Sequence, residues 1–254
     1  MELAKRLVKK VFKSVGLRIS YYRTEKLNVK PKHNIPEEEL YLPVYSPWNE
    51  NAKSEFNELM KMSLPYTLVS RDRCFLIYSL AIQSLHLHGM FYECGVYKGG
   101  TALLLSNILL RHRTYSYQKL YLFDTFEGMP DTDERNDLHK KGDFSDTNFQ
   151  TVTERIGIPD LVEVNKGFIP NTFMGKENQT ICFAHIDVDI YKSVIDCCEF
   201  IYPRLLKGGV LIFDDYGFRS CPGAKKAVDY FFRDKIEVPL ILPTGQAIIF
   251  KISD

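Results

Sequence analysis

The chain has 254 residues, of which 45% are hydrophobic and 26% are charged, a composition typical of a globular protein and not of a collagen-like or low-complexity chain. Its six cysteines show no CxxC spacing, and no apolar run approaches the roughly 18 residues that a membrane-spanning helix needs. The sequence therefore predicts a cytoplasmic protein with reduced thiols and no disulfide framework.

The first 32 residues carry most of the positive charge. They contain ten Lys and Arg against two Glu, so this segment carries +8 and the rest of the chain carries −7. Such an acidic body argues against a nucleic-acid binder. Apolar residues recur at helical spacing over residues 2–16, with lysines between them, which predicts a basic amphipathic helix ended by Gly16. Two interpretations stay open: the helix docks on protein, including a partner subunit of a homo-oligomer, or it adsorbs peripherally to an anionic membrane.

A second segment, residues 28–50, contains four prolines and scattered aromatic residues. This pattern suits neither a helix nor a strand, so it predicts a connecting arm. We therefore expect an N-terminal appendage over residues 1–53 and a globular domain over residues 54–254.

From residue 54 onward, apolar runs alternate with helical stretches. Ser70 predicts the N-cap of a helix that runs to His88, before Gly89. The predicted strands are 90–94, 120–123, 161–164, 181–186 and 210–213, and the further helices are 100–112, 147–157, 191–205 and 222–234. Two final runs, 238–242 and 247–252, flank a Pro-Thr-Gly-Gln turn and predict a hairpin. The order predicts an α/β fold: a doubly wound, mostly parallel seven-stranded sheet with an antiparallel C-terminal strand.

The first predicted strand runs into a glycine-rich turn, Glu93-Cys94-Gly95-Val96-Tyr97-Lys98-Gly99-Gly100-Thr101. Glycines at such a point let the backbone approach a ligand, and they let the following helix point its N-terminus at it. The GxxxGG spacing differs from the GxGxxG of dinucleotide enzymes. It suits the amino-acid end of S-adenosylmethionine, whose ammonium group Glu93 would hold. The alternative interpretation is an ordinary strand–helix turn.

Asp124 ends the next predicted strand, 29 residues after Gly95. A carboxylate at that point can accept hydrogen bonds from both hydroxyl groups of a ribose, as in other nucleotide-binding doubly wound sheets. A lone aspartate at a strand end is more often a helix cap, but the glycine loop upstream favours the ribose interpretation.

Four aspartates follow two later strands: Asp187 and Asp189 after the fourth, Asp214 and Asp215 after the fifth. Ligands of doubly wound sheets bind at the carboxyl ends of the strands, so we expect these side chains in one crevice. Because carboxylates repel one another unless a cation balances them, the pattern predicts a hard divalent ion, Mg²⁺.

Two alternatives to the magnesium interpretation stay open. The aspartates would only cap helices, or Asp187-Val188-Asp189 would be the DxD motif of a metal-dependent glycosyltransferase. The six histidines form no pair at metal-binding spacing on a predicted helix, and no Cys–His pattern points to nucleophilic catalysis.

In combination, these motifs closely resemble the macrocin O-methyltransferase family, also called TylF. The matching stretches lie within residues 65–250 and are 93–100, 123–130, 166–172, 185–193 and 214–217. The resemblance implies a class I methyltransferase domain over residues 54–254. It further implies that S-adenosylmethionine and Mg²⁺ serve to methylate a hydroxyl, typically of a sugar in a natural product or surface glycan.

Matched position by position, the resemblance also implies roles for individual residues. Asp187, Asp214 and Asp215 would bind the metal, and Asp189 would be the catalytic base. The cofactor would be lined by Thr67, Glu93, Gly95, Val96, Tyr97, Gly99, Asp124, Thr125, Gly167 and Phe168, with Asp143 or Ser145 at the adenine. Family members commonly carry Trp where this chain has Phe168, a departure that still permits stacking.

Overall fold

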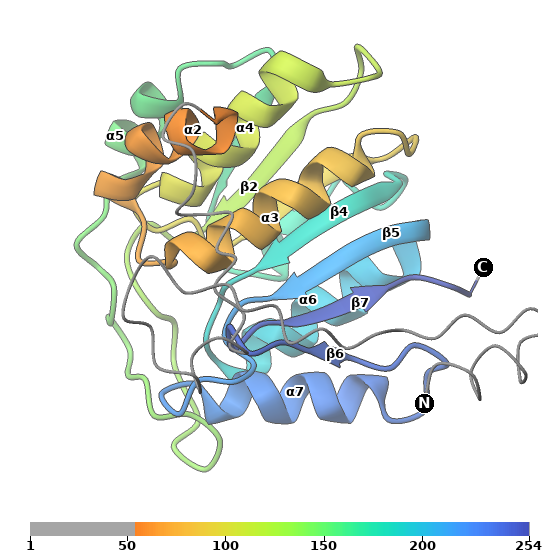
Figure 1. The fold of residues 1–254 in the computed structure, drawn as a ribbon. Coiled ribbons are helices and arrows are strands. Elements are labelled where there is room, and N and C mark those ends of the chain that lie inside the picture. Colours follow the sequence, from red (N-terminus) through yellow and green to blue (C-terminus); the bar gives the residue numbers. More distant parts are fainter. Residues whose placement is uncertain (1–53, 254) are drawn as a thin grey trace, which may run out of the picture. The chain divides into compact units, whose positions relative to one another are not determined.

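Seven strands form the central sheet of the computed structural model, which describes residues 54–253 (Figure 1). In chain order they are β1 (Met90–Cys94), β2 (Leu120–Asp124), β3 (Val162–Lys166), β4 (Ile181–Ile186), β5 (Leu205–Phe213), β6 (Leu240–Ile241) and β7 (Ala247–Phe250). The spatial order is β3-β2-β1-β4-β5-β7-β6. Strands β1 to β5 are parallel, and β7 runs antiparallel to both β5 and β6. The predicted fold class and its C-terminal hairpin are therefore confirmed.

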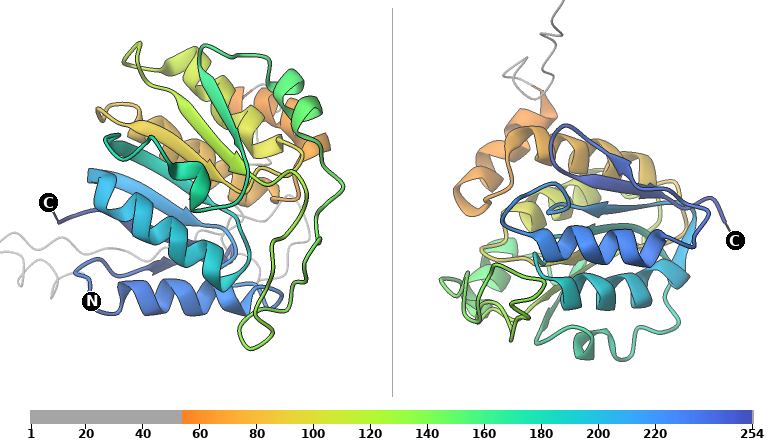
Figure 2. Two further views of the ribbon diagram at one scale, coloured as in Figure 1. Left: turned by 180° about the vertical axis from the view of Figure 1, so that it is seen from behind. Right: turned by 90° about the horizontal axis from the view of Figure 1, so that it is seen from below.

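Helices cover both faces of this sheet, as the two views of Figure 2 show. One face packs against α2 (Glu55–Ser63), α3 (Arg71–Ser84), α4 (Gly100–His112) and α5 (Phe149–Ile156), and the other against α6 (Tyr191–Ile201) and α7 (Pro222–Phe232). Within residues 54–253, three short 3₁₀ helices connect the longer elements: η2 (Leu64–Tyr66), η3 (Asn171–Phe173) and η4 (Tyr202–Arg204). Consecutive strand residues point to opposite faces, so Phe91 joins the first core and Tyr92 the second. Burial on both faces explains why the central strands read as continuous apolar runs.

Two predicted helices end four residues earlier than expected. The helix predicted over 70–88 begins after Ser70 but ends at Ser84. The side-chain amide of Gln118 donates to the Leu85 and Leu87 carbonyls, at 3.2 and 2.9 Å, and so stabilises a turn in place of a further helical turn. The helix predicted over 191–205 ends at Ile201, because Pro203 has no backbone N–H to continue it and β5 begins at Leu205.

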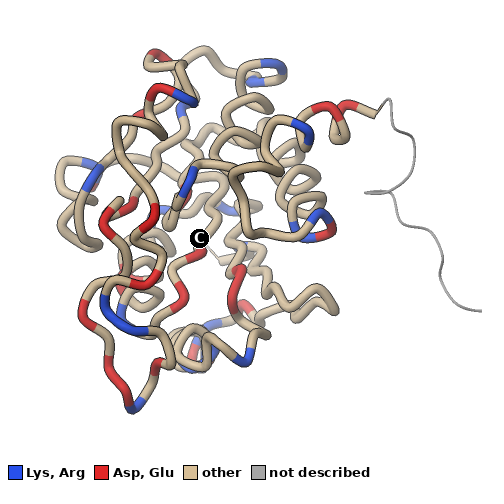
Figure 3. The backbone as a smooth tube through the Cα atoms, turned by 90° about the vertical axis from the view of Figure 1, so that its left-hand side faces the viewer, with Lys and Arg blue, Asp and Glu red and all other residues tan. Residues whose placement is uncertain are grey.

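The predictions for the N-terminal segment lie outside the described residues. They comprise the amphipathic helix over 2–16, the arm over 28–50 and the domain boundary after residue 53. Within residues 54–253, no helix is both long and apolar enough to cross a membrane. Along this part of the chain, Lys and Arg positions are interspersed with Asp and Glu positions (Figure 3).

Candidate active site

A cavity of about 270 Å³ opens at the carboxyl edge of the five parallel strands. Its walls are built by the segments that follow each strand: Gly95 to Tyr97 after β1, Asp124 and Thr125 at the end of β2, Gly167 and Phe168 after β3, Asp187 to Asp189 after β4, and Asp214 and Asp215 after β5. This is the edge at which doubly wound sheets bind their ligands.

Glycines in the loop after β1 let three segments approach one another closely. Gly95 has φ +86°, and a Cβ atom there would lie 1.8 Å from the Asp187 carbonyl oxygen. A Cβ atom on Gly100 would lie 2.5 Å from the Thr67 backbone nitrogen. Only residues without a Cβ allow these contacts, so the glycines bring the ends of β1 and β4 together and place Thr67 at the cavity.

Asp124 holds the glycine loop in shape. Its Oδ2 accepts hydrogen bonds from the backbone N–H groups of Val96 and Tyr97, at 2.7 and 2.9 Å, and its Oδ1 accepts from Phe126 at 2.6 Å. A carboxylate offers about four lone-pair directions, so little acceptor capacity remains toward the cavity. Asp124 therefore shapes the loop as well as lining the predicted ribose site.

Asp187 and Asp214 meet at one wall of the cavity, with His185 beside them. One ligand atom from each of the three side chains lies within 4.8 Å of the others. His185 is fully buried, with Nδ1 3.1 Å from Glu93 Oε1 and Nε2 3.4 Å from Asp214 Oδ1. Burial alone would lower the pKa of His185, but the hydrogen bonds with Asp214 and Glu93 raise it to about 10. Both ring nitrogens of His185 thus face carboxylates.

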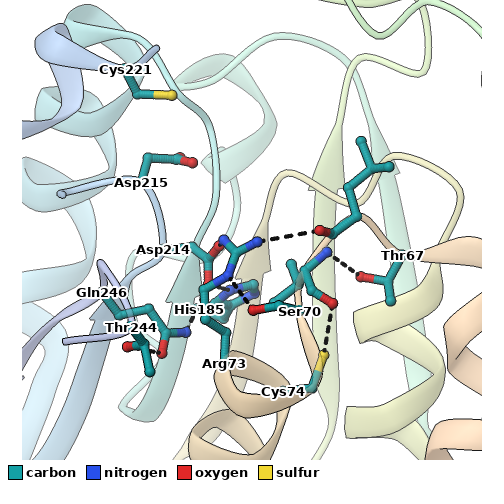
Figure 4. A network of polar contacts seen from close by, with 12 residues as sticks. Thr67, Ser70, Arg73, Cys74, His185, Asp214, Asp215, Cys221, Thr244 and Gln246 are labelled. Atoms are coloured by element: carbon teal, nitrogen blue, oxygen red, sulfur yellow. Dashed lines mark hydrogen bonds and ion pairs between the residues drawn. The ribbon is translucent and has the colours of Figure 1, made fainter. Parts of the chain in front are cut away.

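Asp214 is also engaged by two residues that the sequence analysis did not single out (Figure 4). Arg73, from α3, forms an ion pair with Oδ2, and the Gln246 side-chain amide donates to Oδ1 at 2.7 Å. The guanidinium group also donates to the Leu68 carbonyl at 3.2 Å and lies 4.7 Å from the centre of the Phe218 ring. Burial would raise the pKa of Asp214, but the hydrogen bond with His185 and the charges of His185 and Arg73 hold it below the ordinary value.

Asp187 and Asp215 are less well compensated, although the charges of His185 and Arg73 act to lower the pKa of Asp187. No hydrogen bond or ion pair from residues 54–253 reaches the Asp187 carboxylate, while Asp215 Oδ2 accepts the backbone N–H of Asp189 at 2.9 Å. Burial raises the pKa of both groups well above the ordinary value, and the neighbouring carboxylates raise it further. A cation close to these two acids would favour their ionised forms.

Asp189 lies in a left-handed turn (φ +56°) directly after β4. Its Oδ1 accepts a hydrogen bond from Cys221 Sγ at 3.2 Å and lies 3.7 Å from His139 Nε2. Burial raises the pKa of Asp189 above the ordinary value, although Cys221 and His139 act in the opposite direction. Its side chain keeps 16% of its surface exposed, so a ligand in the cavity can reach it.

Three predicted cofactor residues do not line the cavity. Glu93 is fully buried: its Oε1 lies 3.1 Å from His185 Nδ1, and its Oε2 has no hydrogen-bond partner among residues 54–253. Gly99 forms the N-cap of α4 and packs near Val152. Ser145 is exposed outside the cavity, whereas Asp143 lines it. The remaining cofactor residues line the cavity: Thr67, Gly95, Val96, Tyr97, Asp124, Thr125, Gly167 and Phe168.

One Cys–His contact that the sequence did not single out lies at the cavity. Cys221 Sγ lies 3.6 Å from His139 Nε2, although the two residues are 82 positions apart. His139 belongs to the irregular stretch between β2 and α5, where no periodicity predicts the direction of a side chain. Arg73 was missed for a related reason, since an arginine in the first turn of a helix ordinarily points to solvent.

Comparisons with known proteins agree with this geometry. Residues 47–251 match the model of the family described as macrocin-O-methyltransferase (TylF). One relative is the 8-demethyl-8-(2,3-dimethoxy-alpha-L-rhamnosyl)-tetracenomycin-C 4'-O-methyltransferase of Streptomyces olivaceus, 28% identical over 64% of this chain and 66% of its own. Another is the demethyldecarbamoylnovobiocin O-methyltransferase of Streptomyces niveus, 29% identical over 59% of this chain and 60% of its own. The matched part therefore spans slightly less than two thirds of either relative.

Solved structures show the same fold. The O-methyltransferase NovP superimposes with a TM-score of 0.66 at 24% identity, covering 74% of this chain and 83% of that one. The calicheamicin methyltransferase CalS11 gives a TM-score of 0.63 at 18% identity, covering 77% and 90%. Because the family model matches most of this chain's length, the chain belongs to the macrocin-O-methyltransferase (TylF) family.

Proposed function

We propose that this protein transfers the methyl group of S-adenosylmethionine to a sugar hydroxyl of a natural product or surface glycan, with the aid of Mg²⁺. The observation that carries the proposal is that one cavity joins a glycine loop, shaped by Asp124, to four aspartates at the ends of β4 and β5. The glycine loop with Asp124 is able to hold a nucleoside and an amino-acid chain, and the four aspartates are able to activate a hydroxyl. The family match supports this assignment.

In the proposed reaction, the acceptor oxygen attacks the sulfonium methyl group. A bond forms between oxygen and carbon, the carbon–sulfur bond breaks, and its electron pair leaves with S-adenosylhomocysteine. Asp189 takes the hydroxyl proton, a role favoured by its exposure to the cavity and by burial, which raises its pKa and makes it a stronger base. The remaining requirement is alignment of oxygen, methyl and sulfur, which a preformed cavity provides.

The aspartate group fits a hard cation. Asp187 has no hydrogen-bond donor among residues 54–253, and Asp187 and Asp215 both have raised pKa values that a cation would lower. Asp187 and Asp215, with Asp214, would hold Mg²⁺ through carboxylate oxygens, the ligands that this ion prefers. Asp214 would have to share oxygens that already accept from Arg73, Gln246 and His185. When bound, the ion would lower the pKa of the acceptor hydroxyl.

A sugar acceptor is favoured by the names of the relatives. One is named for O-methylation of a rhamnosyl-tetracenomycin, and a third, 29% identical over 52% of this chain, as the mycinamicin III 3''-O-methyltransferase of Micromonospora griseorubida. The glycosyltransferase interpretation of Asp187-Val188-Asp189 receives no such support, because the compared proteins are methyltransferases.

Calorimetric titration tests the proposal directly. S-adenosylmethionine and S-adenosylhomocysteine should bind, and a nucleotide sugar should not. A panel of glycosides incubated with the protein and methyl-labelled cofactor should then yield a labelled product, and EDTA should abolish the transfer. Binding of a nucleotide sugar in place of the cofactor would favour the glycosyltransferase alternative, and full activity in EDTA would exclude the magnesium role.

A further inference from the structure

Three side chains of different chemistry meet at the cavity wall near the start of α7. His139 comes from the loop between β2 and α5, Asp189 from the turn after β4, and Cys221 from the N-cap of α7. Their facing atoms are 3.2 Å apart for Cys221 Sγ and Asp189 Oδ1, 3.6 Å for Sγ and His139 Nε2, and 3.7 Å for Nε2 and Oδ1. All three residues line the cavity.

These separations are close to those of ligands on one metal ion. Tetrahedral zinc with Zn–S of about 2.3 Å and Zn–N or Zn–O of about 2.0–2.2 Å places its ligand atoms roughly 3.3–3.6 Å apart. The Sγ–Nε2 distance of 3.6 Å lies within that range, and the other two distances, 3.2 and 3.7 Å, lie about 0.1 Å outside it. Only small side-chain movements would therefore be needed to close the three residues on an ion.

The histidine is already oriented for coordination. Its Nδ1 lies 3.1 Å from Asp143 Oδ2, an oxygen that also accepts the Lys140 backbone N–H at 3.0 Å. The Phe144 ring packs beside the imidazole, with ring centres 5.3 Å apart. Metal-binding histidines commonly donate their second ring N–H to a carboxylate in this way, which fixes the tautomer and directs the other nitrogen at the metal.

We propose that His139, Asp189 and Cys221 form a binding site for a borderline-soft divalent metal, zinc above all, distinct from the aspartate group assigned to Mg²⁺. Imidazole and thiolate ligands select zinc, whereas Mg²⁺ requires oxygen ligands. Three protein ligands leave a fourth position, and the cavity is where it opens. The Cys221 thiol gives up its proton when the ion binds.

Zinc at this site would also engage Asp189. Under the proposed function, the ion would remove the base from the reaction, and the enzyme would be inhibited by zinc. That consequence rests on the proposed function, but metal binding itself does not. The result of a metal-binding test therefore does not depend on whether the protein transfers methyl groups.

Cobalt serves as the spectroscopic probe. Metal-free full-length protein, kept reduced, is titrated with Co²⁺ and followed by absorption, because a thiolate on Co²⁺ gives a sulfur-to-metal charge-transfer band. We expect this band to saturate at one ion per chain, to disappear when Zn²⁺ is added, and to persist in excess Mg²⁺. Cys221→Ser should lose the band, and His139→Gln should weaken Co²⁺ binding by at least about tenfold. Asp143→Asn should weaken it by about 10–100-fold through the orientation of His139.

Cys182→Ala is the matched control, since Cys182 is buried in β4 and donates to the Met90 carbonyl. It should keep the band. Circular dichroism establishes that each variant is folded, and His139→Gln carries the test if Cys221→Ser does not fold. Absence of the band from the parent protein overturns the proposal. So does a band that survives Cys221→Ser, because another cysteine would then be the ligand.

Discussion

Replacing Arg73 with Met tests whether Arg73 neutralises the buried carboxylate of Asp214 at the end of β5. The Arg73 side chain is 12% exposed and its partner Asp214 is fully buried. Removing one partner of a buried ion pair costs about 3–5 kcal/mol, because it leaves a charge without compensation. Asp214 would retain Gln246 and His185, so we expect the lower end, about 3 kcal/mol. For a domain of this size that corresponds to a fall of roughly 6–12 °C in the melting temperature.

Thermal unfolding followed by circular dichroism measures this loss. Arg111→Met is the matched control, since Arg111 pairs with Glu55 at the surface, where a pair contributes less than about 1 kcal/mol. Mg²⁺ should raise the melting temperature of Arg73→Met by more than that of the parent, because Asp214 Oδ2 no longer has a cation. Equal melting temperatures for Arg73→Met and the parent would refute the assignment of Arg73 as the neutralising charge.

Three further predictions concern Asp189, Asp124 and Glu237. Asp189→Asn should bind S-adenosylmethionine normally in calorimetry but lose turnover by about 10²–10⁴-fold. The turnover rate of the parent protein should rise with pH through the raised pKa of Asp189, because only the ionised carboxylate accepts a proton. Asp124→Asn should weaken cofactor binding by about 1.5–3 kcal/mol, since an amide cannot accept from all three loop N–H groups; unchanged affinity would contradict the role given to this residue. Glu237, buried against Tyr202 and Ser253, has a pKa well below its ordinary value because hydrogen bonds from Ser253 and Tyr202 outweigh burial. Glu237→Gln should therefore cost about 1.5–3 kcal/mol in urea unfolding at neutral pH. The difference in unfolding free energy between the parent and Glu237→Gln should shrink as the pH falls below the ordinary pKa of a glutamate. At such a pH the unfolded parent chain takes up a proton at Glu237 while the folded parent keeps Glu237 ionised, and this stabilises the unfolded state.

The sequence predicted the central strands well because burial on both faces makes them nearly continuous apolar runs. Residues 90–94 and 181–186 match β1 and β4 at both ends. Helix ends were less predictable, since they depend on contacts from distant residues. The helix that begins after Ser70 stops at Ser84 because of Gln118, which lies more than thirty positions later and has no periodic signal.

Within the site, backbone position was predictable and side-chain pairing was not. Parallel strands end at one edge, so the meeting of Asp124, Asp187 and Asp214 at one cavity follows from topology alone. The partners of these residues come from elsewhere: Arg73 from a helix on one face of the sheet and Gln246 from the C-terminal hairpin. Glu93 illustrates the same limit, because its place at the end of β1 was predicted and its buried contact with His185 was not.

The four aspartates at the ends of β4 and β5 differ in how far the protein itself compensates their negative charge. At β5, Asp214 has Arg73, His185 and Gln246 around it, and its pKa is held low. After β4, Asp187 and Asp189 have raised pKa values. The pKa of Asp215 is also raised, by burial and by the neighbouring charges of Asp189, Asp187 and Asp214. An acid whose pKa is raised by folding destabilises the folded state as the pH rises above its unfolded value, and a bound cation offsets that loss. The protein's own cations thus compensate Asp214, while Asp187, Asp189 and Asp215 keep raised pKa values that a bound cation would lower.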